Sequence, residues 1–482
     1  MNAAGAVAAV DLGATSGRVL LGRFGPSDLT IQPIARFENR PVRLPDGLHW
    51  SVLELHRHAL DGLAAAVREA PDLASIGIDA WGCDYGLLRE NRLLGNPYSH
   101  RDERTTATVE LTHAAIGPAE LYARNGLQHL AFNSVFQLVA DRDSGLLALA
   151  DGMLLLPDLF GFWLTGTRVA ERTNASTTGL LSARDGRWDA ELAVLLDLPP
   201  TILPTLVDAG TTLGGLSAGT ARDIGTTTAQ LTAVASHDTA SAVAAVPATD
   251  PEFGYISCGT WSLVGVELEQ PVLTEASRRA RFTNELGLDG RIRYLHNVNG
   301  LWLLSETVRD WEQCGTHVDL PLLLAQAAEV PGPIPIFDAD DPVFLPPGDM
   351  PDRIGRWLAD HDLPTPQSRP ALVRSILQSL ATTFARVLSA AQALSGQQMR
   401  AVHLVGGGSQ NRLLCQLTAD ASGLPVFAGP VEATAIGNVL VQARALGWVH
   451  GDIETLRALV SRHFRPVRYS PRSTAAISAA AG

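Results

Sequence analysis

Short apolar runs alternate with polar, glycine-rich turns along this chain. The apolar run at residues 6–10 is followed by a polar segment at 11–17 and a second apolar run at 18–22. Such runs predict buried strands, and the small residues between them predict a tight hairpin. The pattern recurs farther along, where the polar segment 257–262 separates apolar residues 255–256 from 263–266. Because these two hairpins lie about half a chain apart, we expect two similar α/β halves.

The segment between the halves predicts the domain boundary. Residues 246–251 contain two prolines and few apolar side chains, which is typical of a linker. We therefore expect an N-terminal domain at residues 1–247 and a C-terminal domain at 248–482. Together they predict a two-domain α/β fold.

Three further apolar runs, at 74–78, 231–235 and 401–405, predict strands that end in polar or glycine-rich turns. Ligands bind beyond the carboxyl ends of strands in α/β sheets, so these turns are candidate walls of a site. Apolar residues at helical spacing predict helices over 371–394 and from 432 to about 446. Six prolines in residues 331–347 predict a surface excursion without regular helix, and the alanine-rich tail at 475–482 predicts a frayed end.

The composition removes several classes of protein. All 37 basic side chains among the 482 residues are arginine, so an ordinary P-loop, a protein-kinase fold and Schiff-base chemistry, which need lysine, are excluded. The net charge of −13 argues against a nucleic-acid partner, and Arg278, Arg279 and Arg281 predict a solvated face. The four scattered cysteines predict neither disulfides nor structural zinc. With no leader-like start and no long apolar run, we expect a cytoplasmic protein without a membrane partner.

The two hairpins predict a clamp for phosphate groups. Backbone N–H groups and hydroxyls in such turns point inward, and glycine lets a charged ligand approach closely. Asp11, at the end of the first strand, is suited either to hold a hydrated Mg²⁺ or to accept hydrogen bonds from the turn.

Asp238 follows an apolar run and has two interpretations. Its carboxylate could accept the proton of a substrate hydroxyl during phosphoryl transfer, or it could cap a helix predicted over residues 239–245. The local sequence alone favours the cap. The segment 215–219 matches the G-x-S-x-G pattern of serine hydrolases, but the turn-like residues before it are not the buried strand that this motif requires.

Taken together, these segments resemble the FGGY family of carbohydrate kinases, within the actin/hexokinase superfamily of ATPases. The resemblance covers nearly the whole chain and rests on residues 11–18, 77–82, 101–105, 257–262 and 406–408. Residues 235–242, 297–304 and 428–434 are similar to the branch of the family that phosphorylates the 1-hydroxyl of L-rhamnulose in rhamnose degradation. The implied fold is the two-domain, actin-like (ribonuclease H-like) α/β ATPase, with ATP in the interdomain cleft.

The resemblance also implies roles for single residues. Asp238 matches the family's proton acceptor, which reverses the preference for a cap. Gly82, His237, Thr239 and Asn297 match positions that bind the sugar. Asp11 matches the carboxylate on the Mg²⁺ side. The positions that match ATP contacts are Ala14, Thr15, Ser16, Gly17, Arg18, Thr260, Ser305 and Gly407.

Two positions depart from the family pattern. Ser305 stands where the better-known enzymes have glutamine, and Leu286 replaces the first glycine of an Asn-Glu-Gly-Gly motif. Neither change touches Asp238, so both bear on nucleotide affinity more than on the reaction.

The expected activity is therefore transfer of phosphate from ATP to a small ketose, with Asp238 as the proton acceptor. Two alternatives stay open: a kinase for another ketose, such as L-fuculose or D-xylulose, and an ATP-driven binding protein of the actin or chaperone kind on the same core. The oligomeric state, monomer or homodimer, is left open by the sequence.

Overall fold

The computed structural model describes residues 5–25, 28–226 and 228–472, and its contacts divide the chain into two compact units. The first unit comprises Met1–Ala245, Glu267–Tyr294 and Ala433–His463. The second comprises Val246–Val266, Leu295–Glu432 and Phe464–Gly482. The chain first changes unit between Ala245 and Val246, at the start of the proline-containing segment, and then returns to the first unit twice. The tail at 475–482 lies outside the described residues.

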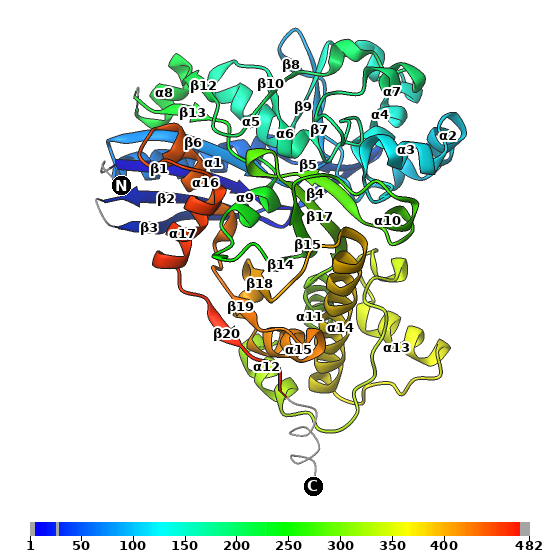
Figure 1. Ribbon diagram of the computed structural model, residues 1–482. Helices are drawn as coiled ribbons and strands as arrows, with labels where there is room; N and C mark the ends of the chain where they lie inside the picture. The colour runs from blue at the N-terminus through cyan, green and yellow to red at the C-terminus, as the bar shows by residue number, and fades with distance from the viewer. Residues whose placement is uncertain (1–4, 26–27, 227, 473–482) are drawn as a thin grey trace. The chain divides into compact units, whose positions relative to one another are not determined.

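A six-stranded sheet forms the centre of the first unit, in the order β12-β13-β6-β1-β2-β3 (Figure 1). Its strands are β1 (Gly5–Leu12), β2 (Ser16–Phe24), β3 (Leu29–Glu38), β6 (Leu73–Ala80), β12 (Thr212–Gly215) and β13 (Gln230–Thr232). β1 pairs antiparallel with β2 and parallel with β6, which sets Asp11 opposite both Arg18 and Asp79. The predicted hairpin is confirmed, but its strands include Leu12 and Ser16, so only residues 13–15 form the turn.

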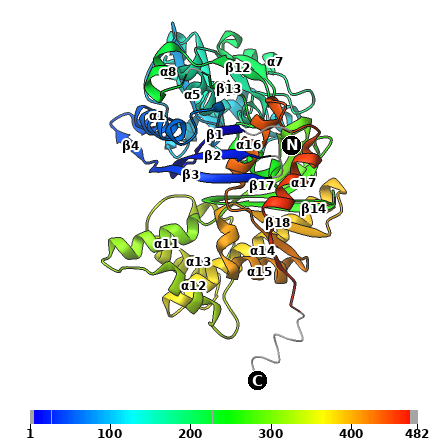
Figure 2. The same ribbon diagram turned by 90° about the vertical axis from the view of Figure 1, so that its left-hand side faces the viewer.

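Two helices cover opposite faces of this sheet, as Figure 2 shows. α1 (Val52–Glu69) presents Val52, Leu55, Ala59 and Leu63 at helical spacing, and all four are buried. A Cβ on Gly62 of α1 would lie 2.5 Å from Val19, whereas a Cβ on Gly22 would lie 2.5 Å from Val439 of α16 (Ala433–Ala445). Val19 and Gly22 point to opposite faces of β2, since side chains alternate along a strand. The strand β1 between these helices is therefore buried almost completely.

The remaining elements of the first unit are further strands and connecting helices. The strands are β4 (Pro41–Leu44), β5 (Gly47–Trp50), β7 (Tyr85–Arg89), β8 (Arg92–Leu93), β9 (Gly152–Leu155), β10 (Val169–Glu171), β11 (Thr205–Val207) and β16 (Thr283–Leu286). The helices are α2 (Thr106–Ala115), α3 (Pro118–Asn125), α4 (Ser134–Asp143), α5 (Leu156–Thr165), α6 (Arg172–Ala175), α7 (Ala190–Leu195), α8 (Ala218–Ile224), α9 (Asp238–Ala244), α10 (Glu275–Arg279) and α17 (Ile453–His463).

The second unit repeats the theme of a hairpin next to a parallel strand. β14 (Phe253–Cys258) pairs antiparallel with β15 (Trp261–Leu268) and parallel with β18 (Ala401–Val405). β18 pairs parallel with β19 (Val426–Ala428), which pairs antiparallel with β20 (Val467–Tyr469). β17 (Ile292–Asn299) leads into the helices, which are α11 (Trp302–Gln313), α12 (Leu320–Ala328), α13 (Met350–Asp360), α14 (Arg369–Ser395) and α15 (Arg412–Ser422).

Several predicted elements are confirmed, and two need correction. α14 and α16 match the expected helices to within two residues, and β18 matches its predicted strand at both ends. The strand expected at 231–235 ends at Thr232, and farther on Ser236 donates from its backbone and its hydroxyl to the Glu171 side chain instead of to a neighbouring strand.

The proline-rich stretch at 331–347 has only one 3-10 turn, Pro342–Phe344, as predicted, but it is not simply a surface excursion. Phe337 and Phe344 in it are buried, because proline blocks a helix without preventing neighbouring apolar side chains from packing inward. Among the described residues, no helix is both long and apolar enough to cross a membrane.

Candidate active site

The turn of the first hairpin is tied to its surroundings by backbone bonds. Gly13 N–H donates to the Ser16 carbonyl at 3.0 Å, and Asn39 N–H donates to the Thr15 carbonyl at the same distance. Of the predicted ATP contacts here, Thr15 is exposed and Ala14 and Ser16 are half-buried. Gly17 instead lies inside β2, where a Cβ would sit 2.2 Å from the Phe37 ring. Thr15 is therefore the exposed residue of the turn, and its two neighbours are partly accessible.

Asp11 and Arg18 face each other across this hairpin. Arg18 donates from Nε to Asp11 Oδ2 at 2.8 Å, and its Nη2 lies 2.7 Å from the same oxygen. The Arg18 side chain is 28% exposed and that of Asp11 is 6% exposed. The pair places one cation and one anion at the hairpin, where a phosphate and its counter-ion would need them.

The structure also tests whether Mg²⁺ fits near Asp11. No group of three or more His, Cys, Asp or Glu side chains that could hold a metal occurs in the part of the chain that the structure describes. Mg²⁺ bound with a nucleotide commonly takes only one or two protein carboxylates, and phosphates and water supply the rest. The single Asp11 carboxylate at the hairpin turn fits that requirement.

Asp79, opposite Asp11 on β6, is a buried carboxyl that the sequence did not assign. It accepts a hydrogen bond from Asn438 Nδ2 of α16 at 2.5 Å, while its Oδ1 has no hydrogen-bond partner among the described residues. Burial, followed by the negative charges of Asp11 and Asp238, raises the pKa of Asp79 well above its ordinary value. The buried Asp79 carboxyl therefore holds its proton more tightly than an ordinary aspartate does.

Gly82 lies in a constrained turn after β6. A Cβ on Gly82 would sit 2.8 Å from Thr177 Oγ1, and the same hydroxyl accepts a hydrogen bond from Cys83 N–H at 3.0 Å. Cys83 has a φ of 72°, a left-handed conformation that costs free energy for a residue other than glycine. Strained backbone of this kind clusters at binding sites, and it occurs here beside a predicted sugar contact.

The segment that carries Asp238 is held against the end of β6. Ala80 N–H donates to the Ser236 carbonyl at 2.9 Å, and the buried Asn174 side chain donates to the same carbonyl at 3.3 Å. Glu171 accepts hydrogen bonds from both the backbone and the hydroxyl of Ser236, each at 2.9 Å. Asn174 and Glu171 fix the segment just before His237, and no pattern in the sequence marked them.

Asp238 is the first residue of α9, directly after the N-cap residue His237. Its Oδ1 accepts from Thr239 N–H at 2.5 Å and from the Thr239 hydroxyl at 3.1 Å, and the side chain is 29% exposed. The carboxylate thus satisfies an N–H group of its own helix and still reaches solvent. Burial raises the pKa of Asp238, with Asp11 adding to the rise and His237 opposing it, so the carboxyl is more basic than usual.

His237 is buried and has three charged neighbours. Its Nε2 lies 3.5 Å from Asp238 Oδ1, and its Nδ1 lies 2.9 Å from Arg293 Nη2 and 3.2 Å from Glu285 Oε2. Glu285 belongs to a motif that the sequence singled out, but only for its neighbour Leu286. Nothing in the sequence pattern marked Arg293 as part of the site, because an arginine within a predicted strand does not show which residue it will contact.

In the second unit, Thr260, Ser305 and Gly407 lie near one end of the sheet. The Gly259 and Thr260 carbonyls accept hydrogen bonds from Leu301 and Trp302 N–H, each at 3.0 Å, so the hairpin turn joins the start of α11, where Ser305 is exposed. A Cβ on Gly408 would lie 2.2 Å from Cys258 Sγ, whereas a Cβ on Gly407 would meet nothing within 4 Å. Gly407 therefore presents open backbone beside the hairpin.

Two further polar side chains of this unit are Asn297 and Asn411. Asn297 is half-buried on β17. Asn411, which follows the glycine run, accepts a hydrogen bond from Leu414 N–H at 3.0 Å and so caps α15.

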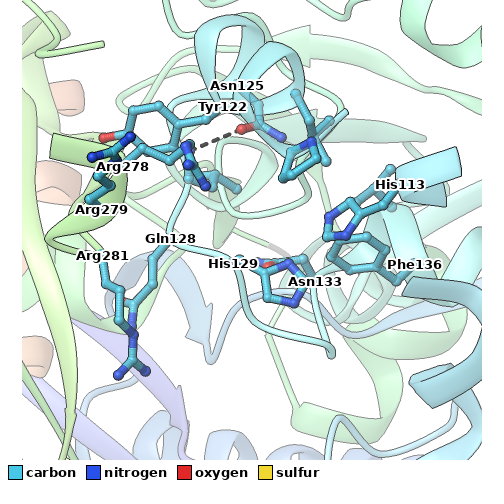
Figure 3. Close-up of a pocket in the computed structure, with 14 residues that line it drawn as sticks. His113, Tyr122, Asn125, Gln128, His129, Asn133, Phe136, Arg278, Arg279 and Arg281 are labelled. Atoms are coloured by element: carbon cyan, nitrogen blue, oxygen red, sulfur yellow. Dashed lines mark hydrogen bonds between the residues drawn. The ribbon is translucent and has the colours of Figure 1, made fainter. Parts of the chain in front are cut away.

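A cavity of about 290 Å³ lies in the first unit (Figure 3). Asn133 lines it and donates to the Thr177 carbonyl at 3.4 Å, which connects its wall to the strained turn. Arg278 and Arg279 also line it, and both form ion pairs with Glu275. Two arginines of the segment predicted to be a solvated face therefore line a cavity and form ion pairs. None of the predicted site residues is among the residues that line this cavity.

The chain was compared with known proteins. It matches the N-terminal domain of the FGGY family of carbohydrate kinases over residues 7–245 and the C-terminal domain over 254–446. It is 40% identical to a rhamnulokinase of Bacteroides thetaiotaomicron over 476 residues, which cover 98% of this chain and 97% of that protein. It is 40% identical to a rhamnulokinase of Pectobacterium atrosepticum over 474 residues, covering 97% of this chain and 93% of that protein.

Solved structures show the same fold. A xylulose kinase from Lactobacillus acidophilus superimposes with a TM-score of 0.79 at 16% identity, covering 99% of this chain and 95% of that one. A gluconate kinase from the same organism gives 0.78 at 15% identity, covering 99% and 96%. At such identity these structures bear on the fold alone, which is the actin-like α/β fold expected from the sequence. The two family matches and the sequence relatives show that the chain belongs to the FGGY family of carbohydrate kinases and is a sugar kinase.

Proposed function

We propose that this kinase transfers the γ-phosphate of ATP to the 1-hydroxyl of L-rhamnulose, giving L-rhamnulose 1-phosphate and ADP. The observation that carries the proposal is the Asp238 carboxylate, which is anchored by Thr239 yet 29% exposed beside His237. The choice of ketose is supported by the two relatives named rhamnulokinase, each 40% identical over almost the whole chain.

In the proposed reaction, Asp238 accepts the proton of the sugar hydroxyl as its oxygen attacks the γ-phosphorus. The new O–P bond forms while the bond from the γ-phosphorus to the leaving oxygen of ADP breaks. A positioned base of this kind contributes about 10²–10⁴-fold, and orientation and charge neutralisation supply the rest. The raised pKa of Asp238 suits the role, because it makes the carboxylate a better proton acceptor.

We assign the other predicted residues accordingly. Gly82, His237, Thr239 and Asn297 bind the sugar. Thr15 with its neighbours Ala14 and Ser16, the strand residues Gly17 and Arg18, and Thr260, Ser305 and Gly407 bind ATP. Asp11 would hold Mg²⁺, which when bound neutralises phosphate charge. Arg18 has two tasks in this assignment, since its guanidinium also pairs with Asp11.

The test is ADP release measured by a coupled assay with L-rhamnulose, L-fuculose, D-xylulose and glycerol as acceptors. We expect the highest kcat/KM with L-rhamnulose. A clear preference for another ketose would leave a sugar kinase but overturn the substrate. No sugar-dependent ADP release from any acceptor would contradict the kinase assignment itself and favour an ATP-driven binding protein.

A further inference from the structure

Behind His237 lies a buried ion pair that has no role in the reaction as described so far. Arg293, on β17, is completely buried, and its Nη2 lies 3.0 Å from Glu285 Oε2. Arg293 also donates from Nε to the Leu286 carbonyl at 3.1 Å, which fixes the plane of the guanidinium. Burying a charged pair is costly, and in some proteins such a pair is retained for specificity rather than for stability.

The pair contacts one nitrogen of the imidazole. Arg293 Nη2 lies 2.9 Å from His237 Nδ1, at hydrogen-bond distance. An arginine is always protonated and has only donors, so this bond forms only when Nδ1 keeps its lone pair. The ring proton of a neutral His237 must then be on Nε2. Glu285 is the competing partner for Nδ1 at 3.2 Å, but Arg293 already neutralises its charge.

The tautomer matters because Nε2 faces Asp238, with 3.5 Å between Nε2 and Oδ1. A nitrogen that carries a proton can donate a hydrogen bond but cannot accept the proton of a sugar hydroxyl. If the proton moved to Nδ1, the Nε2 lone pair would compete with Asp238 as the base. Histidine is the side chain most often used for that purpose, so the competition is chemically realistic.

We propose that Arg293, paired with Glu285, is a positioning residue that holds His237 in its neutral Nε2–H tautomer and so leaves Asp238 as the only proton acceptor beside the sugar. The role rests on the proposed function of Asp238. Glu285 also has a role in this arrangement: its carboxylate compensates the buried Arg293 charge, and the Arg293 charge keeps the pKa of Glu285 below its ordinary value despite burial.

Nitrogen NMR of protein labelled with ¹⁵N-histidine tests the proposal without any sugar. The His237 signals are identified by their loss in His237→Gln, and the two ring nitrogens are distinguished by their chemical shifts. We expect Nε2–H in the wild type and a shift of the proton to Nδ1 in Arg293→Met, because Nδ1–H can then donate to Glu285. Retention of Nε2–H in a folded Arg293→Met protein would overturn the proposal, as would Nδ1–H in the wild type.

Arg293→Met leaves Glu285 buried without its partner and can unfold the protein. The double variant Glu285→Leu with Arg293→Met removes both charges, and there we expect a mixture of tautomers. With L-rhamnulose we expect kcat to fall at least about tenfold in the double variant, the effect of one lost hydrogen bond to a charged group. Arg293→Lys, which keeps a cationic donor, should restore part of kcat and the Nε2–H signal. A folded double variant with wild-type kcat and Nε2–H would overturn the proposal.

Arg291→Met is the matched control. Arg291 lies two residues before Arg293, is partly exposed and pairs with Glu454, far from His237 in its contacts. We expect it to change neither the tautomer nor kcat. If the wild type releases no ADP with any sugar, the proposed function fails, whereas the tautomer experiment still decides what Arg293 does to His237.

Discussion

At the scale of single residues, the site depends on carboxyl groups that differ in their surroundings. Asp238 and Asp79 both have raised pKa values, the first while partly exposed and the second completely buried. Asp84, two residues after Gly82, shows the opposite shift. It is completely buried, yet its pKa is lowered, because the charge of His100 and several hydrogen bonds outweigh the cost of burial. The surroundings of each carboxyl therefore give different pKa values to groups that look equivalent in the sequence.

Asp84 holds two tryptophans and an amide around the Gly82 turn. Trp50 and Trp81 donate to its Oδ2 at 2.6 and 2.8 Å, and Gln137 donates to its Oδ1 at 3.0 Å. Asp84→Asn removes the charge and puts an amide group where an indole N–H now donates. We expect a loss of about 3 kcal/mol in the free energy of unfolding at pH 7, measured by urea denaturation.

The same variant carries a pH test. A lowered pKa in the folded state means that the stabilisation is complete above the pKa of the unfolded chain, near about 4, and is lost as the pH falls through the folded value. The stability difference between wild type and Asp84→Asn should therefore shrink below about pH 4. A difference that stays constant down to pH 2, or grows, would contradict the ionised buried carboxylate.

At the scale of elements, α9 is placed by close backbone packing against α16. A Cβ on Gly437 of α16 would lie 1.9 Å from the Ser241 carbonyl of α9, so only glycine permits this approach. Asn438, the next residue, reaches Asp79, and Gln442 one turn later donates to the Ala8 carbonyl of β1 at 3.0 Å. α16 thus connects the helix that begins with Asp238 to the strands that carry Asp79 and Asp11.

Gly437→Ala should separate these helices. We expect a loss of about 1–3 kcal/mol or more in stability and a lower kcat, because the new methyl group meets rigid backbone. Thermal unfolding and steady-state kinetics measure both. Gly355→Ala is the control: it lies in α13, where the nearest atom to a Cβ is 3.7 Å away, and alanine should stabilise that helix by up to about 1 kcal/mol. Equal stability changes in the two variants would contradict the packing argument.

At the scale of the whole molecule, the hairpins and many core strands could be predicted from sequence because each is a local pattern of apolar runs and small turn residues. α14 and α16 could be predicted from apolar residues at helical spacing, and β18 from an apolar run. The side chains that position the site residues could not be predicted from the sequence. Asn174, Glu171 and Arg293 reach Ser236 or His237 from distant segments, and a single polar residue in a strand or helix carries no mark of what it will contact.

The absence of lysine has a consequence for the complete protein. If arginine, hydroxyls and backbone N–H groups bind the phosphates, no ε-amine takes part in catalysis. We therefore expect reductive methylation of amines to leave kcat and the KM for ATP unchanged. The arginine reagent phenylglyoxal should inactivate the enzyme, and ATP should slow that inactivation. Full activity after treatment with phenylglyoxal, or inactivation that ATP does not slow, would contradict the phosphate assignment.

The most direct test of the central claim is single-turnover phosphoryl transfer to L-rhamnulose by Asp238→Asn, with ATP affinity measured by titration. Asp223→Asn, at an exposed position of α8, is the control and should behave as the wild type. We predict that Asp238→Asn binds ATP with near-normal affinity and transfers phosphate at least about 10²-fold more slowly. A transfer rate within a few-fold of the wild type would contradict the account, because Asp238 would then not be the group that accepts the proton.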